Sequence, residues 1–398
     1  MHIIPDRIAS KSYFNRALIC ASYADHRVDL KGFSASDDVQ KMQIALQDLK
    51  PNAVYDCGSA GTVLRFLALR LSRLPGSHVL LGSNRLLARP QDELENIFSQ
   101  LNVKLEKHAD RLVIHSDGWR PKTSTLKVDR TISSQFASAV LLNAWNLDFP
   151  LTLQWDQVGV SEGYWQMSAA IVQEFGMSLD ETIQQVTIAK NSRVKIDSYV
   201  IESDLSSAFA VAAFAALNGS ATFQHFPHRS LQPDRIFSSI LEKMNVDVRA
   251  GSSFLHVSKK ANAPLLGIHQ DLNNCPDLFP VLATLCAFAN GPSRLDNAPH
   301  LVFKESNRIQ KIAELLKNIN VETKILSDGI EIFPPTDLKT QAHTAPFNFD
   351  TDHDHRLAFA AALVKSQGFP IQIKHPEVVA KSFPEFWDIV GYKLTALS

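Results

Sequence analysis

Six stretches of the chain begin with polar or charged residues and then become apolar on almost every side. They start at residues 10, 61, 133, 205, 276 and 354 and read SKSYFNRALICASYA, GTVLRFLALRL, SSQFASAVLLNAW, LSSAFAVAAFAALNG, PDLFPVLATLCAFANG and DHRLAFAAALVKSQG. A helix that is apolar all round is buried inside a domain. The pattern therefore predicts six buried helices, one for each of six structural units.

Amphipathic helices and short strands lie between these stretches. The apolar spacing predicts helices at residues 37–49, 90–101 and 306–319, and β-branched or aromatic runs predict strands at 111–116, 185–190, 254–259 and 330–335. Each unit then has two helices and several strands. The fold class predicted is α/β (α+β).

An internal repeat supports this division. The segments IFSQLNVKLE, IVQEFGMSLD, ILEKMNVDVR and LLKNINVETK each end a helix at Asn or Gly and continue as a strand. Asn and Gly tolerate the left-handed conformation that ends helices, so we expect C-terminal caps at Asn102, Gly176, Asn245 and Asn320. These positions are 74, 69 and 75 residues apart. The repeat predicts three units in each of two similar domains.

Length and composition fit an ordinary globular protein. The 398 residues exceed the usual size of one domain, and 45% are hydrophobic and 20% charged. The longest apolar stretch, Leu278 to Ala289, is shorter than the roughly 18 residues of a membrane span. The first 20 residues do not have the pattern of a signal peptide. We expect no transmembrane helix and a cytoplasmic protein.

The cysteines and the net charge point to no special partner. The four cysteines are scattered without a C-x-x-C pair, so we expect buried free thiols at Cys20, Cys57, Cys275 and Cys286. The formal net charge is -1, which gives no overall field to attract nucleic acid or a membrane. An anion site must therefore be built locally.

Several cations lie where a helix begins, although the positive end of the helix dipole disfavours them there. They are Lys11, Arg16, Arg65, Arg308 and Arg356. A bound anion would reverse this preference, since helix N-termini and arginines both bind phosphate and carboxylate groups. We infer a small, multiply anionic substrate. Capping accounts for the polar residues at Thr62, Ser133, Ser134 and Asp354, but not for the cations.

The motifs of the chain resemble those of the 5-enolpyruvylshikimate-3-phosphate synthase family. In order they are SKSYFNRAL, GSAGTVLR, LLARPQDEL, SSQF, VSEGY, ESDLSSA, CPDL, FKESNRI, DHRLA and AKSFPEFW, from about Ser10 to Trp387. The resemblance implies two domains of three βαβαββ units each, with the active site in the cleft between them. It places one domain at residues 10–202 and the other at 1–9 with 203–398. Hinges are expected near Ile8 to Ser10 and Glu202 to Asp204.

The resemblance also implies the reaction. The family transfers the enolpyruvyl group of phosphoenolpyruvate to the 5-hydroxyl of shikimate 3-phosphate and releases phosphate, through a tetrahedral intermediate. It uses no metal or organic cofactor and usually acts as a monomer, with these two small molecules as its only partners.

Site residues follow from the matching motifs. Those expected to contact shikimate 3-phosphate are Ser12, Arg16, Ser133, Ser134, Gln135, Ser161, Tyr164, Asp277, His300 and Lys304. Those expected to contact phosphoenolpyruvate are Lys11, Gly61, Arg65, Arg89, Gln135, Arg308, Arg356 and Lys381. For catalysis, Asp277 is expected to be the base for the hydroxyl and Glu305 the acid toward the methylene. Lys304 orients the hydroxyl or shares proton transfer, and Lys11 completes the catalytic set.

The chain departs from the family pattern at several positions. Ser59 and His300 each stand where the family has Asn, Asn307 replaces a common Asp, and Ala9 replaces Gly. The link between the helix at 37–49 and DCGSAGT is short, as if a strand hairpin were missing.

Three alternatives remain. The related UDP-N-acetylglucosamine enolpyruvyl transferases have Lys-Asn in place of Lys11-Ser12 and a catalytic cysteine on a mobile loop. A catalytically silent relative would bind anions without turnover. A metal site at DTDHDHR, residues 350–356, would use His and Asp ligands, but the motif has no partner elsewhere, and its acidic residues are explained as caps.

Overall fold

The protein is divided into two compact units. The structure, a computed structural model, describes residues 2–3, 8–157, 159–336, 338 and 345–392. The N unit is Ala9–Glu202, and the C unit combines Met1–Ile8 with Ser203–Ser398. Each unit has its own core of buried apolar side chains.

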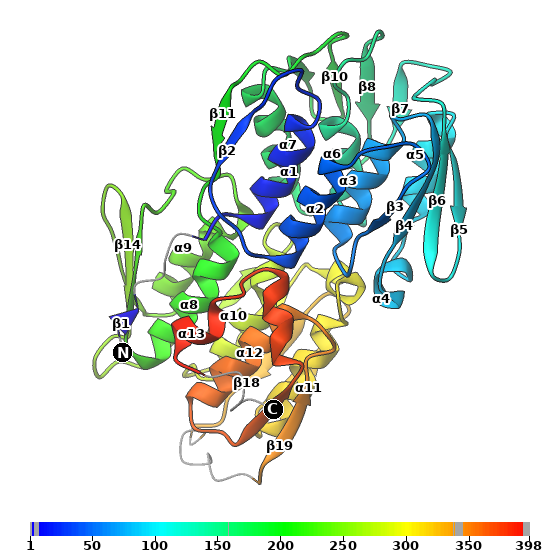
Figure 1. Cartoon of the computed structure of the whole chain (residues 1–398). Helices are drawn as coiled ribbons and strands as arrows, with labels where there is room; N and C mark the ends of the chain where they lie inside the picture. The colour runs from blue at the N-terminus through cyan, green and yellow to red at the C-terminus, as the bar shows by residue number, and fades with distance from the viewer. Residues whose placement is uncertain (1, 4–7, 158, 337, 339–344, 393–398) are drawn as a thin grey trace. The chain divides into compact units, whose positions relative to one another are not determined.

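The N unit has helices in its interior and strands toward its outside (Figure 1). Its helices are α1 (Lys11–Ala21), α2 (Asp37–Gln47), α3 (Gly61–Leu71), α4 (Asn84–Leu87), α5 (Asp92–Gln100), α6 (Gln135–Leu142) and α7 (Glu162–Glu174). Its strands are β2 (Asp29–Lys31), β3 (Val54–Asp56), β4 (Gly76–Leu81), β5 (Lys104–Lys107), β6 (Arg111–Ser116), β7 (Thr125–Lys127), β8 (Leu151–Gln154), β9 (Leu179–Glu181), β10 (Gln185–Ile188) and β11 (Ser198–Val200).

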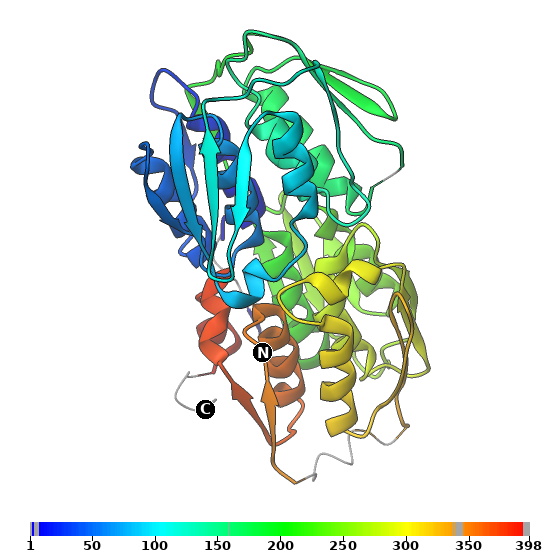
Figure 2. The ribbon, with the colours of Figure 1, turned by 90° about the vertical axis from the view of Figure 1, so that its right-hand side faces the viewer.

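The C unit also combines buried helices with short sheets (Figure 2). Its helices are α8 (Leu205–Asn218), α9 (Phe237–Lys243), α10 (Phe279–Cys286), α11 (Arg308–Asn318), α12 (His355–Ser366) and α13 (Phe386–Val390). Short 3₁₀ helices are η1 (Pro233–Ile236), η2 (Pro276–Leu278), η3 (Pro299–Phe303) and η5 (Pro376–Lys381). The strands are β1 (His2–Ile3), β12 (Ser220–Gln224), β13 (Asp247–Ala250), β14 (Phe254–Ser258), β15 (His269–Asp271), β16 (Ser293–Asp296), β17 (Glu322–Ile325), β18 (Ile330–Phe333), β19 (Phe347–Asp350) and β20 (Ile371–Lys374).

One sheet topology occurs four times. The orders β3-β4-β6-β5, β7-β8-β10-β9, β1-β12-β14-β13 and β15-β16-β18-β17 each consist of a parallel pair followed by an antiparallel hairpin. Chain order within three of these is βαβαββ, and in the fourth β1 supplies the first strand from the other end of the chain. The mixed fold expected from the sequence is confirmed.

Two sheets are smaller than the four-stranded pattern. The sheets β11-β2 and β19-β20 keep only the parallel pair among the described residues. After α2, the chain reaches β3 of the next sheet within a few residues, which leaves no room for a hairpin. The missing hairpin inferred from the short link is thus confirmed.

The predicted helices and strands are present. The six apolar stretches form α1, α3, α6, α8, α10 and α12, and the four strand motifs form β6, β10, β14 and β18. The role predicted for Thr62 is wrong, because Ala60 is the N-cap of α3 and Thr62 is already inside the helix. Asp354 does cap α12, since its side chain accepts from the backbone N–H of Arg356.

Four helices end with the same capping motif. The residues at Asn102, Gly176, Asn245 and Asn320 all have positive φ, as predicted. In each case the next residue donates its backbone N–H to a carbonyl five positions earlier, at 2.9–3.0 Å: Val103 to Phe98, Met177 to Val172, Val246 to Leu241 and Val321 to Leu316. This is the Schellman motif, and it satisfies carbonyls that a helix end leaves open.

Asn320→Ala is expected to lower the free energy of unfolding by about 1 kcal/mol, because alanine tolerates the left-handed conformation poorly. Asn320 has φ 59° and is exposed, so lost packing contributes little. Urea unfolding should show the loss for Asn320→Ala but not for Asn320→Gly or for Lys317→Ala on the same helix. Equal midpoints for all three variants would contradict the role of the cap.

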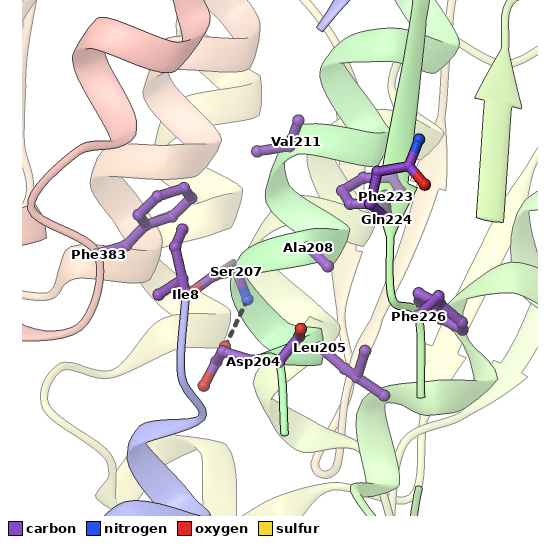
Figure 3. A pocket seen from close by; sticks show the side chains of 11 residues that line it. Ile8, Asp204, Leu205, Ser207, Ala208, Val211, Phe223, Gln224, Phe226 and Phe383 are labelled. Atoms are coloured by element: carbon purple, nitrogen blue, oxygen red, sulfur yellow. Dashed lines mark hydrogen bonds between the residues drawn. The ribbon is translucent and has the colours of Figure 1, made fainter. Parts of the chain in front are cut away.

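The two chain segments at the boundary of the units pair along the backbone. In the N unit the N–H of Ser10 donates to the carbonyl of Glu202, and in the C unit that of Asp204 donates to Ile8, both at 2.8 Å. A small apolar pocket of about 30 Å³ lies beside them in the C unit (Figure 3). Asp204 caps α8 at its rim by accepting from the N–H of Ser207 at 2.7 Å. None of the predicted site residues lines this pocket, and the expected hinge stays a prediction.

Candidate functional site

A buried ionic cluster in the C unit is centred on Arg308, the first residue of α11. Its guanidinium is 1% exposed and donates to Asp354 at 2.8 Å, to Asp277 at 2.9 Å and to Glu305 at 3.0 Å. Burial by itself would lower the pKa of Arg308, but the three carboxylates raise it. The guanidinium therefore stays charged inside the protein.

Asp277 lies in η2 and is held by cations from two helices. Arg308 contacts one carboxylate oxygen, Arg356 of α12 donates to the other at 3.0 Å, and Lys304 lies 3.8 Å away. Burial raises the pKa of Asp277, yet Arg356, Lys304 and Arg308 together bring it well below the usual range. The position of Asp277 directly after Pro276 would also suit an N-cap, but the N-cap of η2 is Cys275 and that of α10 is Leu278.

Glu305 joins the same cluster from the segment between η3 and α11. One oxygen accepts from Arg308, and the other lies 3.2 Å from the ammonium of Lys381, the last residue of η5. Lys381 is almost completely buried. The structure thus brings together the predicted residues Asp277, Lys304, Glu305, Arg308, Arg356 and Lys381.

His300 lies in η3 and is buried. Its pKa is lowered to about 3, mainly by burial and also by the nearby charge of Lys304. The imidazole is therefore neutral at ordinary pH. Among the described residues neither of its ring nitrogens has a hydrogen-bond partner. A neutral imidazole can donate and accept, as the Asn of the family pattern can.

Two carboxylates of this cluster were not predicted as site residues. Asp354 caps α12, accepts from Arg308 and also accepts from the hydroxyl of Ser306 at 3.0 Å. Asp234, in η1, is 3% exposed and accepts a hydrogen bond from Ser206. The pKa of Asp234 is raised to about 7, mainly by burial and also by the negative charge of Asp277. The sequence around Asp234, LQPDRIF, carries no signal that would have revealed it.

Stability should fall with rising pH because of Asp234. Its pKa is about 7 in the folded protein and about 4 for an unfolded Asp, so the folded state holds the proton more tightly. This contribution is complete below pH 4 and is lost as the pH rises to 7. Asp234→Asn should therefore show a flatter decline of the urea midpoint between pH 4.5 and 7.5. Identical pH profiles for the variant and the parent protein would contradict this assignment.

The N unit holds a second group of predicted residues around Arg16 of α1. Its guanidinium donates to Ser168 at 2.8 Å and to the carbonyls of Ser12 and Tyr164 at 2.9 and 3.2 Å. It also lies 5.8 Å from the centre of the Tyr164 ring. Burial lowers the pKa of Arg16 to about 10, still well above neutral pH. The predicted residues Ser12, Arg16 and Tyr164 therefore meet in one place.

Arg65, Arg89, Gly61 and Gln135 form a neighbouring group. Arg65 of α3 donates to the side-chain oxygen of Gln135 at 2.8 Å and lies 4.4 Å from the centre of the Phe136 ring. A Cβ atom at Gly61 would lie only 2.7 Å from the guanidinium of Arg89. Only glycine lets this guanidinium lie so close to the start of α3.

Lys11 opens α1 and pairs with a carboxylate that the sequence did not single out. Its ammonium lies 2.8 Å from Asp38 of α2, and the Asp38 side chain is almost completely buried. This ion pair fixes the direction of Lys11, and a buried pair of this kind is costly to break by removing one partner.

The predicted serines begin two packed helices. Ser133 and Ser134 precede α6, where Ser134 is the N-cap without a side-chain capping bond, and Ser161 is the N-cap of α7 with φ 57°. Helices α6 and α7 pack against each other. Two hydroxyl-bearing turns therefore lie at the starts of adjacent helices, where backbone N–H groups attract anions.

Two departures from the family pattern have structural partners. Ser59 donates to the hydroxyl of Ser83 at 3.0 Å. Asn307 is the N-cap of α11 and accepts from the N–H of Gln310 at 3.2 Å, as an Asp would. Both side chains therefore take part in local hydrogen bonds.

The remaining expectations concern thiols, metals and membranes. All four cysteines are buried and free, as predicted. Within the described ranges, no three His, Cys, Asp or Glu side chains gather so that they could hold a metal ion. Over the same part of the chain, no helix has both the length and the apolar character needed to cross a membrane.

Comparisons with known proteins find similarity over most of the chain. Residues 49–390 match the family of EPSP synthase (3-phosphoshikimate 1-carboxyvinyltransferase). The chain is 30% identical to the 3-phosphoshikimate 1-carboxyvinyltransferase of Colwellia psychrerythraea and 31% identical to that of Syntrophobacter fumaroxidans, in each case over 95% of this chain and 94% of the relative.

Solved structures show the same fold. The EPSP synthase of Acinetobacter baumannii superposes with a TM-score of 0.74 at 21% identity, covering 98% of this chain and 94% of that one. The enolpyruvyl transferase NikO of Streptomyces tendae gives 0.72 at 13% identity, covering 100% and 94%.

Proposed function

The chain belongs to the EPSP synthase family, and from this premise we propose which of its residues carry each part of the reaction. The protein is a 3-phosphoshikimate 1-carboxyvinyltransferase of the shikimate pathway, which leads to aromatic amino acids. It transfers the enolpyruvyl group of phosphoenolpyruvate to the 5-hydroxyl of shikimate 3-phosphate and releases phosphate. The observation that supports the assignment of residues is the ionic cluster around Arg308.

Phosphoenolpyruvate binds, in this proposal, to Arg308, Arg356 and Lys381 of the C unit and to Lys11, Gly61, Arg65, Arg89 and Gln135 of the N unit. The ligand carries a phosphate and a carboxylate close together, and such charges need cations when they leave water. Arginine suits both groups because its guanidinium can donate two parallel hydrogen bonds. The backbone at Gly61 leaves room for Arg89.

Shikimate 3-phosphate binds to the other predicted set. The phosphate accepts hydrogen bonds from Ser133, Ser134 and Ser161, and the carboxylate from Ser12 and Arg16. Tyr164 flanks the ring, Gln135 lies beside both substrates, and the neutral imidazole of His300 hydrogen-bonds a ring hydroxyl. The position of Arg16 supports its part in this proposal, because its charged guanidinium donates to the carbonyls of Ser12 and Tyr164 and so lies beside both of these residues.

Proton transfer is assigned to two carboxylates of the cluster. Asp277 accepts the proton of the 5-hydroxyl, and Lys304, 3.8 Å from it, orients that hydroxyl or shares the transfer. Glu305 protonates the methylene carbon. Without substrate both Glu305 oxygens face cations, Arg308 and Lys381. The anionic groups of phosphoenolpyruvate compete for these two cations, and Glu305 can then hold the proton that it delivers.

Phosphate release tests the activity on which the assignment of residues depends. Purified protein given both substrates should release inorganic phosphate, and omitting either substrate should abolish the release. Protein that binds shikimate 3-phosphate but releases nothing would be the catalytically silent relative, and attention would move to Ser59 and His300. A UDP-N-acetylglucosamine acceptor should give no release, because Lys11 is followed by Ser12 and the four cysteines are buried.

We further propose that the enzyme acts as a monomer in the cytoplasm without metal or cofactor. This follows the usual behaviour of the family. Light scattering on a gel-filtration peak would contradict the proposal if it gave twice the 44.2 kDa mass of the chain.

A further inference from the structure

Arg130 occupies an unusual position in the N unit, just before the serines of the proposed phosphate pocket. It lies four residues before Ser134, and its side chain is only 2% exposed. The guanidinium carbon lies 4.3 Å from the centre of the Trp155 ring and 4.9 Å from that of Trp165. Two aromatic faces therefore fix the guanidinium plane.

The same arginine binds the segment that carries the third serine. One of its terminal nitrogens forms an ion pair with Glu162, the residue directly after Ser161. Its backbone carbonyl accepts from the N–H of Val160 at 3.1 Å. At Gly159 an added Cβ would lie 2.6 Å from the Cβ of Arg130, so this backbone lies directly on the arginine. Three contacts thus bind residues 159–162 to Arg130.

The conformation of Ser161 explains why such a hold is needed. Its φ of 57° and ψ of 44° put a residue with a side chain in the left-handed region. This conformation is strained for a residue with a side chain and persists only where the surroundings enforce it. Helices α6 and α7, which follow the turns that carry the three serines, pack side by side (Figure 1).

We propose that Arg130 and Glu162 are positioning residues that hold Ser161 in register with Ser133 and Ser134 for the phosphate of shikimate 3-phosphate. The ion pair joins the turn before α6 to the turn before α7. A phosphate that accepts from all three hydroxyls requires these turns at a fixed separation. The inference rests on the proposed function, since it assumes that the three serines bind that phosphate.

The aromatic faces are themselves fixed. The indole N–H of Trp155 donates to the carbonyl of Ile183 at 2.8 Å, and that of Trp165 donates to Glu181 at 3.0 Å. The two rings meet edge to face, with centres 5.3 Å apart. Arg130 thus packs against two rings that have little freedom to move.

The test measures binding of two ligands that differ only in the phosphate. Calorimetric affinities for shikimate 3-phosphate and for shikimate are compared in the parent protein, Glu162→Gln, Arg130→Met and the double variant. Each single variant should weaken binding of shikimate 3-phosphate about tenfold and leave that of shikimate unchanged. The double variant should lose little more than either single variant, because both remove the same link. Arg130→Lys should recover part of the loss.

The KM values separate positioning from general damage. The KM for shikimate 3-phosphate should rise in the variants, while the KM for phosphoenolpyruvate stays unchanged. Glu162 is partly exposed, so Glu162→Gln remains informative even if Arg130→Met does not fold.

Other outcomes would overturn the inference in distinct ways. Loss in Arg130→Met but none in Glu162→Gln would mean that Arg130 contacts the phosphate directly. Unchanged affinity in both variants would show that the ion pair has no role in binding. If the parent protein bound shikimate 3-phosphate no more tightly than shikimate, the proposal that Ser133, Ser134 and Ser161 bind the phosphate would be refuted. The inference about Arg130 would then be refuted as well.

Discussion

Asp277→Asn is expected to lower kcat by about 10²- to 10⁴-fold, the usual contribution of a general base. Asparagine keeps the shape of the side chain and one oxygen for Arg308 or Arg356, but it cannot take the proton of the 5-hydroxyl. The KM values should change less than kcat, because the residues proposed to bind the phosphate and carboxylate groups remain. Steady-state phosphate release at saturating substrate measures the effect.

The low pKa of Asp277 makes this test sharper. Three cations keep the carboxylate charged, and a base held so firmly is weak until a ligand attracts those cations away. Single-turnover rates should therefore fall in Asp277→Asn even when binding is complete. Asp388→Asn, on the exposed side of α13, serves as the matched control and should match the parent enzyme. A kcat within about threefold of the parent value would assign the base to another group.

Arg308→Met is expected to lower the free energy of unfolding of the C unit by about 3–5 kcal/mol, because removing one member of a buried ion pair leaves the other charge uncompensated. Asp354 is 0% exposed in its side chain and would lose its guanidinium partner. Asp277 and Glu305 would each lose one of their cations. Urea unfolding followed by fluorescence should show an early transition, and turnover should be lost with it.

A second substitution separates charge from packing. In Arg308→Met with Asp354→Asn, the buried carboxylate is neutral, so part of the lost stability should return. Lys317→Met on the same helix is the control, because Lys317 is exposed, and it should leave stability within about 0.5 kcal/mol of the parent protein. If the double variant is less stable than Arg308→Met alone, the loss comes from packing rather than from an unpaired charge.

Local chemistry explains why much of the fold could be predicted. The residue type alone predicted a positive φ at the four helix ends, because few residues other than Gly and Asn tolerate it. These positions are Asn102, Gly176, Asn245 and Asn320. The six buried helices are equally visible, since helices that are apolar on all sides have only one suitable environment. The error at Thr62 arose because the helix begins at Gly61, without a polar cap, where the backbone comes close to Arg89.

The site was less predictable because its partners come from distant segments. The sequence motifs identified Asp277, Glu305 and Arg308 as site residues. Asp234 and Asp354 come near these residues only when distant segments fold together. Asp38 could not be predicted either, because it follows Asp37 at the start of a helix, and such residues are usually exposed to solvent. Its burial against Lys11 depends on how α1 packs on α2. Nothing in the local sequence encodes such pairings.

The strand β1 gives the chain an order of assembly. Residues His2 and Ile3 pair with Ser220 and Ala221, so a sheet of the C unit includes a strand made before any of the N unit. On the ribosome that strand must wait until Ser220 and Ala221 have been synthesised, by which time Ala9–Glu202 can already fold. Closing so long a loop is slow. An affinity tag placed directly before His2 therefore interferes with the folding of the C unit, which is synthesised last. The N unit, which follows the tag in sequence, is not affected.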